Sequence, residues 1–170
     1  MSLKEQQQEV KSKAYAEAIR YMDNAKETLK KAGKEDGRYG DVKYVRTACG
    51  TAYNGVLMAM DAYLFLKGVE QKKGRKSIEY YTSNISNLDK KLLSDVKDVY
   101  SILHLSGYYD GIHDAMLVKR GFDMAYQIID KIKPDYLPEQ STLGKLSLLK
   151  RLYSFFFLNK NAISQLLQVV

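Results

Sequence analysis

The sequence lacks the residues that several classes of site require. Its 170 residues include a single cysteine, Cys49, and no tryptophan. One cysteine cannot form an intramolecular disulfide, and it cannot supply a zinc site built on several thiolates. An unpaired cysteine also fits a reducing compartment, so we expect a cytoplasmic protein.

Long apolar runs are missing as well. The first twenty residues alternate charged with small apolar side chains, so we expect neither a signal peptide nor a membrane anchor there. The most apolar tract, residues 143–158, is interrupted by Lys145, Lys150 and Arg151, whereas a membrane span needs about 20 apolar residues. We therefore expect no membrane partner.

Familiar catalytic motifs are also absent. The sequence contains no GxxxxGK[ST] phosphate loop, no GxGxxG after a strand, no HExxH and no GxSxG elbow. These absences argue against the corresponding enzyme classes. We expect no catalytic residue, no cofactor and no metal.

Basic residues outnumber acidic ones by 27 to 20, which gives a net charge of +7. Much of the excess is local: residues 67–76 carry five positive groups and one negative, and four more cations follow at Lys145, Lys150, Arg151 and Lys160. Nucleic-acid binding requires such charges to collect on one face. A nucleic acid or nucleotide partner is therefore an alternative that the charge does not favour over a solvated surface.

Apolar residues spaced three and four apart predict a helix over residues 10–32 and a longer one over 42–67. Asp41 is placed to cap the second helix and Gly68 to end it. This helix presents a face of small residues, so a neighbouring helix can approach it closely. That face consists of Ala48, Ala52, Gly55 and Ala59.

Further helices are predicted over 78–88, with Ser77 as the cap, and over 92–105. The glycines of SGYYDG indicate a turn at 106–111. Another helix is predicted over 115–132, ended by Pro134, and one or two more over about 141–169.

The predicted fold class is all-α, an antiparallel up-and-down bundle of five or six helices. The length fits one domain over residues 1–170, with a core at about 10–133 and a C-terminal helical segment at about 141–169.

His104 and His113 flank the glycine-rich segment, with Asp110 and Asp114 nearby. Such groups could hold a divalent metal or pair a base with a carboxylate. Helix ends and tight turns recruit the same residue types for capping, and no spacing matches a known metal pattern. We favour the capping interpretation.

Fourteen tyrosines are unusual for this length, and several concentrate in the middle of the chain. They could stack against a ligand ring or bases across a groove, although filling the outer core is the favoured alternative. The candidate ligand-binding residues are Arg46, Tyr53, Asn54, His104, Tyr108, Tyr109, Asp110 and His113.

Cys49 lies between Ala48 and Gly50 on the small-residue part of the second helix. Its position predicts a buried thiol with a raised pKa rather than a nucleophile.

The C-terminal segment is apolar almost all around a helix. Leu149, Tyr153 and Phe156 lie on its main apolar face, and a helix of this kind must be central or covered by a partner. Packing within the chain and an interface in a homodimer or with a protein partner both remain open.

Three segments carry a resemblance to a known family: AYAEAIRYMDNAKETLKKA, RTACGTAYNGVLMAMDAYLFLKG and LHLSGYYDGIHDAMLVKRGFDMAYQIIDKI, within residues 14–132. Their order resembles the HEPN-like helical domains, which include nucleotidyltransferase substrate-binding domains, and more narrowly an uncharacterised bacterial family with an HEPN-like bundle. Members that cut RNA carry an Arg, four to six residues, and then a His. No arginine precedes His104 or His113 at that spacing, so the resemblance implies no catalytic residue here.

Two functional hypotheses follow. The preferred one is a non-catalytic helical bundle that acts through protein contacts or self-association. The alternative is a nucleotide- or RNA-binding HEPN-like module.

Overall fold

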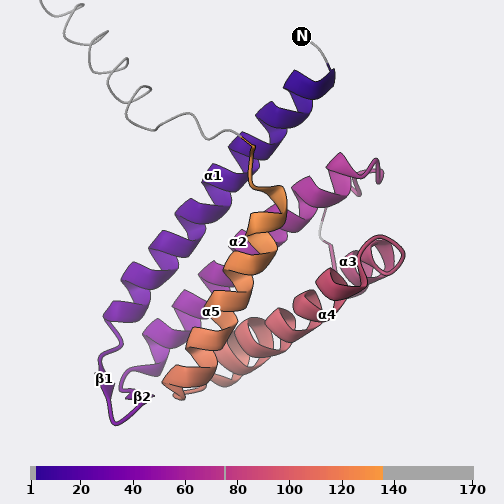
Figure 1. Ribbon diagram of the computed structural model, residues 1–170. Helices are drawn as coiled ribbons and strands as arrows, with labels where there is room; N and C mark the ends of the chain where they lie inside the picture. Colours follow the sequence, from indigo (N-terminus) through magenta and orange to yellow (C-terminus); the bar gives the residue numbers. More distant parts are fainter. Residues whose placement is uncertain (1–2, 75, 136–170) are drawn as a thin grey trace, which may run out of the picture. The chain divides into compact units, whose positions relative to one another are not determined.

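The computed structural model describes residues 3–74 and 76–135, and all of these except Asp135 belong to one compact unit, Met1–Pro134. This part of the chain is helical, which confirms the all-α fold class (Figure 1). The elements are α1 (Leu3–Lys30), β1 (Lys34–Glu35), β2 (Arg38–Tyr39), α2 (Val42–Leu66), α3 (Ile78–Ile85), α4 (Lys90–Val99), the π-helix η1 (Tyr100–Asp110), α5 (Ala115–Ile129) and the 3₁₀ turn η2 (Asp130–Ile132).

The C-terminal helical segment predicted at about 141–169 lies outside the described residues, and so do Leu149, Tyr153 and Phe156. The choice between packing within the chain and an interface there stays open, and the extent of the domain over residues 1–170 stays a prediction.

Helices α1 and α2 form the long antiparallel pair of the bundle (Figure 1). A small hairpin joins them, with Lys34 opposite Tyr39. Its two turn residues, Asp36 and Gly37, have φ of +45° and +76°, the combination that suits a two-residue hairpin loop. The hairpin therefore reverses the chain and returns α2 along α1.

The small-residue face of α2 lies against α1, as predicted. A Cβ on Gly55 would stand 3.1 Å from the carbonyl oxygen of Ala18, so a glycine there lets the two backbones approach closely. Ala48 and Ala52 are fully buried. The small side chains thus set the spacing of the central helix pair.

Aspartate side chains cap α2 at Asp41, as predicted, and α4 at Asp89, where no cap was predicted. The Asp41 carboxylate accepts a hydrogen bond from the backbone N–H of Lys43 at 3.0 Å, and that of Asp89 from Leu92 at 2.9 Å. Ser77 occupies the N-cap position of α3 but makes no capping hydrogen bond with its side chain, so that prediction is wrong in its chemistry. Its hydroxyl bonds the Glu79 carboxylate instead.

The turn predicted over residues 106–111 is wrong. The segment continues α4 as the last part of η1, and the chain turns only at Gly111, where φ is +72° and the N–H donates to the carbonyl of Ser106. Gly107 is buried within the helix, where a Cβ would collide with Cys49. Glycine composition predicts a turn here, whereas Gly107 allows close packing of the helix on α2.

The core lies between α1, α2, α4, α5 and η1. Its largest fully buried side chains come from all of these elements and from α3 and η2. The last of them along the chain is Ile132, two residues before Pro134, the proline predicted to end this helix. These side chains are Met22, Met60, Leu64, Ile85, Leu92, Leu103, Ile128, Ile129, Ile132, Val45, Val56 and Val99.

Replacing Ala52 with leucine is expected to destabilise the bundle by about 1–3 kcal/mol, because Ala52 is fully buried on the close-packed face of α2. Urea unfolding of the variant and the wild type measures the change. An unchanged midpoint would contradict the placement of this face.

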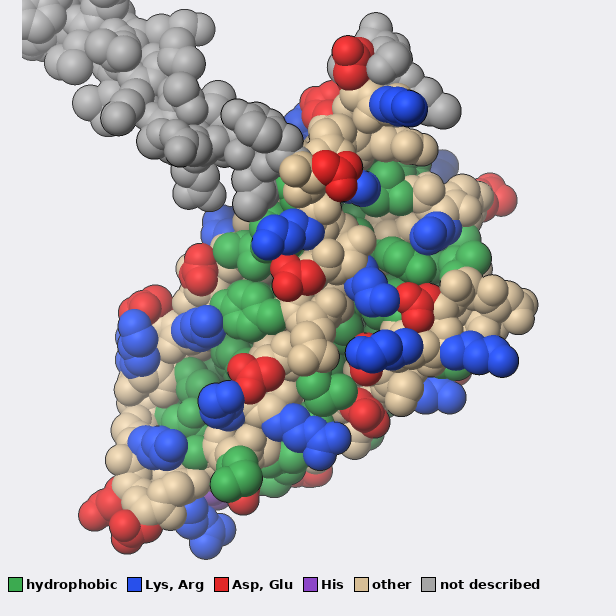
Figure 2. All heavy atoms as spheres, in the orientation of Figure 1, with side chains coloured by type: hydrophobic (Ala, Val, Ile, Leu, Met, Phe, Trp, Pro, Cys, Tyr) green, Lys and Arg blue, Asp and Glu red, His purple; other side chains and the backbone are tan. Residues whose placement is uncertain are grey.

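The face over α1 and α5 carries basic and acidic side chains interspersed rather than one sign gathered together (Figure 2). Several are neighbours on one helix, including the pairs Lys13–Glu9, Lys30–Glu27 and Lys119–Asp123. The net charge of the chain is thus not concentrated on this face. Among the described residues, no helix has the length and apolar character needed to cross a bilayer.

Candidate functional site

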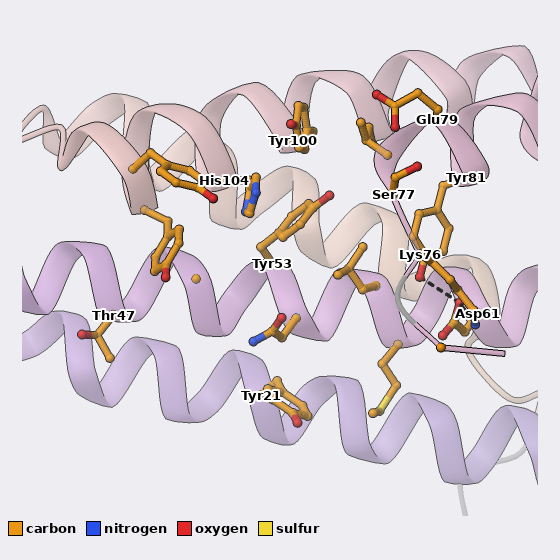
Figure 3. Close-up of a pocket in the computed structure, with 18 residues that line it drawn as sticks. Tyr21, Thr47, Tyr53, Asp61, Lys76, Ser77, Glu79, Tyr81, Tyr100 and His104 are labelled. Atoms are coloured by element: carbon orange, nitrogen blue, oxygen red, sulfur yellow. Dashed lines mark hydrogen bonds and ion pairs between the residues drawn. The ribbon is translucent and has the colours of Figure 1, made fainter. Parts of the chain in front are cut away.

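An open groove of about 1090 Å³ lies between α1, α2, α3 and η1 (Figure 3). One part of it is aromatic and the other carries charged side chains. The lining residues are Tyr21, Thr47, Gly50, Tyr53, Asn54, Leu57, Met58, Asp61, Gly74, Lys76, Ser77, Ile78, Glu79, Tyr81, Tyr100, His104, Tyr108 and Tyr109.

The aromatic part centres on His104. Tyr100, His104 and Tyr108 follow one another at intervals of four along η1, which places their rings on one side of the helix. The His104 ring centroid lies 5.1 Å from that of Tyr100 and 5.8 Å from that of Tyr108, with both pairs stacked. Tyr53 of α2 completes the group at 4.7 Å from His104 (Figure 3).

These rings already touch one another. Aromatic pairs in contact have centroids about 4.5–7 Å apart, which is the spacing found here and leaves no slot for a further ring between two of them. A ligand must therefore lie on the outward surface of the aromatic cluster, which consists of Tyr53, Tyr100, His104, Tyr108 and Tyr109.

Two tyrosines form that outward surface. Tyr108 is 45% exposed and Tyr109 is 57% exposed, and their rings meet edge to face at 5.1 Å. The Tyr108 ring packs over Gly50, where a Cβ would come within 2.9 Å of its Cδ2. Gly50 thus fixes how close to α2 this exposed ring lies.

Burial separates the inner tyrosine from the outer pair. Tyr53 is 6% exposed, and its burial, with smaller effects of Tyr100 and Glu79, raises its pKa. Tyr53 therefore keeps its hydroxyl proton at neutral pH and acts as a neutral wall of the groove.

The charged part is organised around Asp61 of α2. Its carboxylate accepts a hydrogen bond from the Tyr81 hydroxyl at 2.9 Å and pairs with the Lys76 ammonium at 2.8 Å (Figure 3). The Lys76 side chain is only 12% exposed. It comes from the basic connector between α2 and α3, so part of that connector is folded onto the groove rather than solvated.

Glu79 lies in the first turn of α3, along the same wall as Tyr100 (Figure 3). The hydroxyl of Ser77 and the backbone N–H of Glu79 itself lower the pKa of this carboxyl group. Glu79 is therefore ionised at neutral pH, in an exposed position.

Five of the eight candidate ligand-binding residues meet in the groove: Tyr53, Asn54, His104, Tyr108 and Tyr109. The structure thus brings together α2 and the tyrosine-rich segment, the arrangement that the ligand-binding hypothesis requires.

The other three candidates, Arg46, Asp110 and His113, do not line it. Arg46 donates to the backbone carbonyl of Asp110 at 3.3 Å, and a ring nitrogen of His113 is hydrogen-bonded to the backbone carbonyl of Tyr39 at 2.6 Å. Asp114 caps α5 through the N–H of Leu117. Within residues 3–74 and 76–135, no three His, Cys, Asp or Glu side chains are grouped to hold a metal.

The sequence reasoning missed Tyr21, Asp61, Lys76, Glu79 and Tyr81 as groove residues. In the sequence, Lys76 is one of several cations in a basic connector. Nothing near Asp61 in the sequence indicates that Lys76 is its partner. The pairing of these two depends on how the connector folds back over α2, which no local pattern specifies.

Cys49 is fully buried, as predicted, and burial raises the pKa of its thiol to about 12. We expect the folded protein to react with a maleimide at mildly alkaline pH far more slowly than the protein in guanidinium chloride, because the thiolate is scarce and covered. Mass spectrometry of the two samples measures the difference. Equal rates would show that Cys49 is exposed and reactive.

Comparison with known proteins finds similarity to a solved structure and to a protein family. The chain is similar to a protein of unknown function from Dyadobacter fermentans, with 49% sequence identity and a TM-score of 0.65 over 71% of this chain and 94% of that one. Among curated proteins, none matches. A family model described as a domain of unknown function (DUF5618) matches residues 13–134, which hold α2, η1 and the whole groove. The chain therefore belongs to the DUF5618 family.

Proposed function

We propose that this domain is a non-catalytic binding module that holds a segment of a partner protein in its groove. The observation that carries the proposal is the pair Tyr108 and Tyr109, exposed on the wall of an open groove. Tyrosine is enriched at protein interfaces because a rigid ring with a polar tip supplies contact area at small entropic cost.

The makeup of the groove supports binding rather than a reaction. Cys49, the one cysteine of the sequence, does not line the groove, and burial keeps its thiol protonated. Tyr53 is held neutral. Asp61 is already engaged by Lys76 and Tyr81. What the groove offers to a ligand is mainly aromatic surface with polar groups beside it.

Selection of peptides tests this proposal. A phage-displayed library of random peptides is selected on the wild-type protein, and the recovered peptides are synthesised and titrated against the double variant Tyr108→Ala/Tyr109→Ala. Truncating a hot-spot tyrosine costs about 2 kcal/mol or more, and about 1.4 kcal/mol is tenfold, so we expect affinity to fall at least about tenfold. Met116→Ala is the control, since Met116 is 82% exposed and does not line the groove. Peptides that bind all three proteins equally, or no enrichment at all, would refute the proposal.

The second candidate, RNA or nucleotide binding, is favoured by the same exposed rings, on which bases could stack. The groove opposes it, because its one basic residue among those described, Lys76, is paired with Asp61. Labelled single-stranded RNA titrated at two salt concentrations separates the candidates. If the affinity for RNA falls steeply with salt and depends on Tyr108 and Tyr109, the ligand of the groove is RNA and not a protein segment.

Self-association through the C-terminal segment is one of the alternatives that the sequence leaves open. The HEPN-like relationship is a separate hypothesis on which the groove does not depend. Light scattering at tens of micromolar protein tests the homodimer. A monomer at that concentration would remove it and leave the groove as the interaction surface.

A further inference from the structure

We infer that the groove takes a cationic side chain, a lysine ammonium or arginine guanidinium of the bound segment, between Glu79 and the aromatic cluster. The inference rests on the proposed function and names the chemistry of the partner. It begins with the charges that line the groove.

The described lining residues include two carboxylates and one ammonium. The Lys76 ammonium lies 2.8 Å from Asp61 and is also hydrogen-bonded to the Gln71 side chain at 3.4 Å. The charges of Lys76 and Asp61 compensate each other. The other carboxylate, that of the exposed Glu79, has no counter-charge among the described residues that line the groove.

The aromatic cluster contributes the same sign of potential. A tyrosine ring carries negative charge density over its face, and a cation within about 6 Å of the ring centroid is attracted to it. Tyr100 lies on the same wall as Glu79, and Tyr53 lines the same groove (Figure 3). A cation placed between them would interact with a carboxylate and with tyrosine faces at once.

The protein itself already uses this kind of contact. The Lys76 ammonium lies 5.8 Å from the centroid of Tyr80 while it pairs with Asp61, and the Lys26 ammonium lies 4.4 Å from that of Tyr126. At Lys76, one cation thus contacts both a carboxylate and a tyrosine ring. We propose the same arrangement for the ligand cation at Glu79.

The net positive charge of the chain opposes the binding of a cation. With 27 basic and 20 acidic residues, the protein repels a polycation and attracts a polyanion in the absence of a specific site. Binding of a cationic peptide would therefore oppose the overall field and would require a local site of opposite sign.

Fluorescein-labelled pentaarginine, pentalysine and pentaglutamate, titrated by polarisation, test the inference. We expect the two cationic peptides to bind more tightly than pentaglutamate. Glu79→Gln and Tyr100→Leu should each weaken the binding of pentaarginine about two- to fivefold, the range of an exposed cation–π contact. Glu35→Gln, which removes an equal charge from the exposed hairpin strand β1, should leave the affinity unchanged.

Lys76→Gln is expected to change the affinity for pentaarginine in the opposite direction. Removing the ammonium frees the Asp61 carboxylate, so pentaarginine should bind more tightly to this variant, provided that its circular dichroism and melting midpoint match the wild type. If they do not, the Glu79→Gln and Glu35→Gln pair alone decides.

Preference for pentaglutamate, or equal affinities for wild type and Glu79→Gln, would overturn the cationic partner. The proposed function fails differently. If the peptides selected from the random library bind through Tyr108 and Tyr109 but carry no basic residue, the groove binds a protein segment of other chemistry and only the inference falls. If no peptide of any charge binds, both fall.

Discussion

Gly107→Ala is expected to destabilise the protein by about 1–3 kcal/mol, although alanine is the better helix former. A Cβ at this position would lie 2.5 Å from Cys49 Sγ, 2.6 Å from Cys49 Cβ and 3.2 Å from the carbonyl oxygen of Ile102. Because Gly107 and Cys49 are both buried, neither side can move aside without shifting η1 away from α2. Urea unfolding measures the loss.

Two variants control this prediction. Cys49→Gly in the Gly107→Ala background removes both colliding atoms of residue 49, so it should recover part of the loss as a non-additive coupling. Gly50→Ala should cost less than Gly107→Ala, since the atoms it meets belong to the half-exposed ring of Tyr108, which can rotate away. A Gly107→Ala variant as stable as the wild type would contradict the close packing of η1 on α2.

Leu103→Ala is expected to cost about 2–5 kcal/mol, the usual effect of deleting a fully buried leucine side chain. Leu103 is completely buried and lies where α5 passes η1: a Cβ on Gly121 would stand 2.6 Å from Leu103 Cδ2. A cavity here would loosen the helix that carries the aromatic cluster. The change in unfolding free energy is obtained from the same urea experiment.

Leu105→Ala is the matched control for Leu103→Ala. Leu105 stands two residues further along the same helix and is 39% exposed, so its truncation should change stability by less than about 0.5 kcal/mol. A larger loss for Leu105 than for Leu103 would mean that η1 presents a different face to the core.

Local signals were enough to predict the long helices. Asp41 caps α2, and the alanines and glycines of that helix have the spacing that a close helix contact demands. The π-helix was not predictable in this way. Glycines mark turns by composition, whereas Gly107 lies in a helix because Cys49, far away in the sequence, leaves no room for a Cβ.

The groove was predictable in part for the same physical reason. The tyrosine-rich segment and Tyr53 of α2 could be proposed as neighbours because both are aromatic, although the segment itself was predicted as a turn. The charged part depends on a tertiary contact: Lys76 meets Asp61 only once the connector has folded back. Arg46 and His113, which the sequence also singled out, hold backbone carbonyls at the end of η1 and in the hairpin.

The most direct test of the account is where a bound peptide contacts the protein. The tyrosine ring resonances are followed by NMR while the peptides selected on the wild-type protein are added. We predict shifts of Tyr53, Tyr100, Tyr108 and Tyr109, with Tyr39 and Tyr126, which do not line the groove, unchanged. Shifts at Tyr39 or Tyr126 with the groove tyrosines unmoved would contradict the claim that the groove is the binding site.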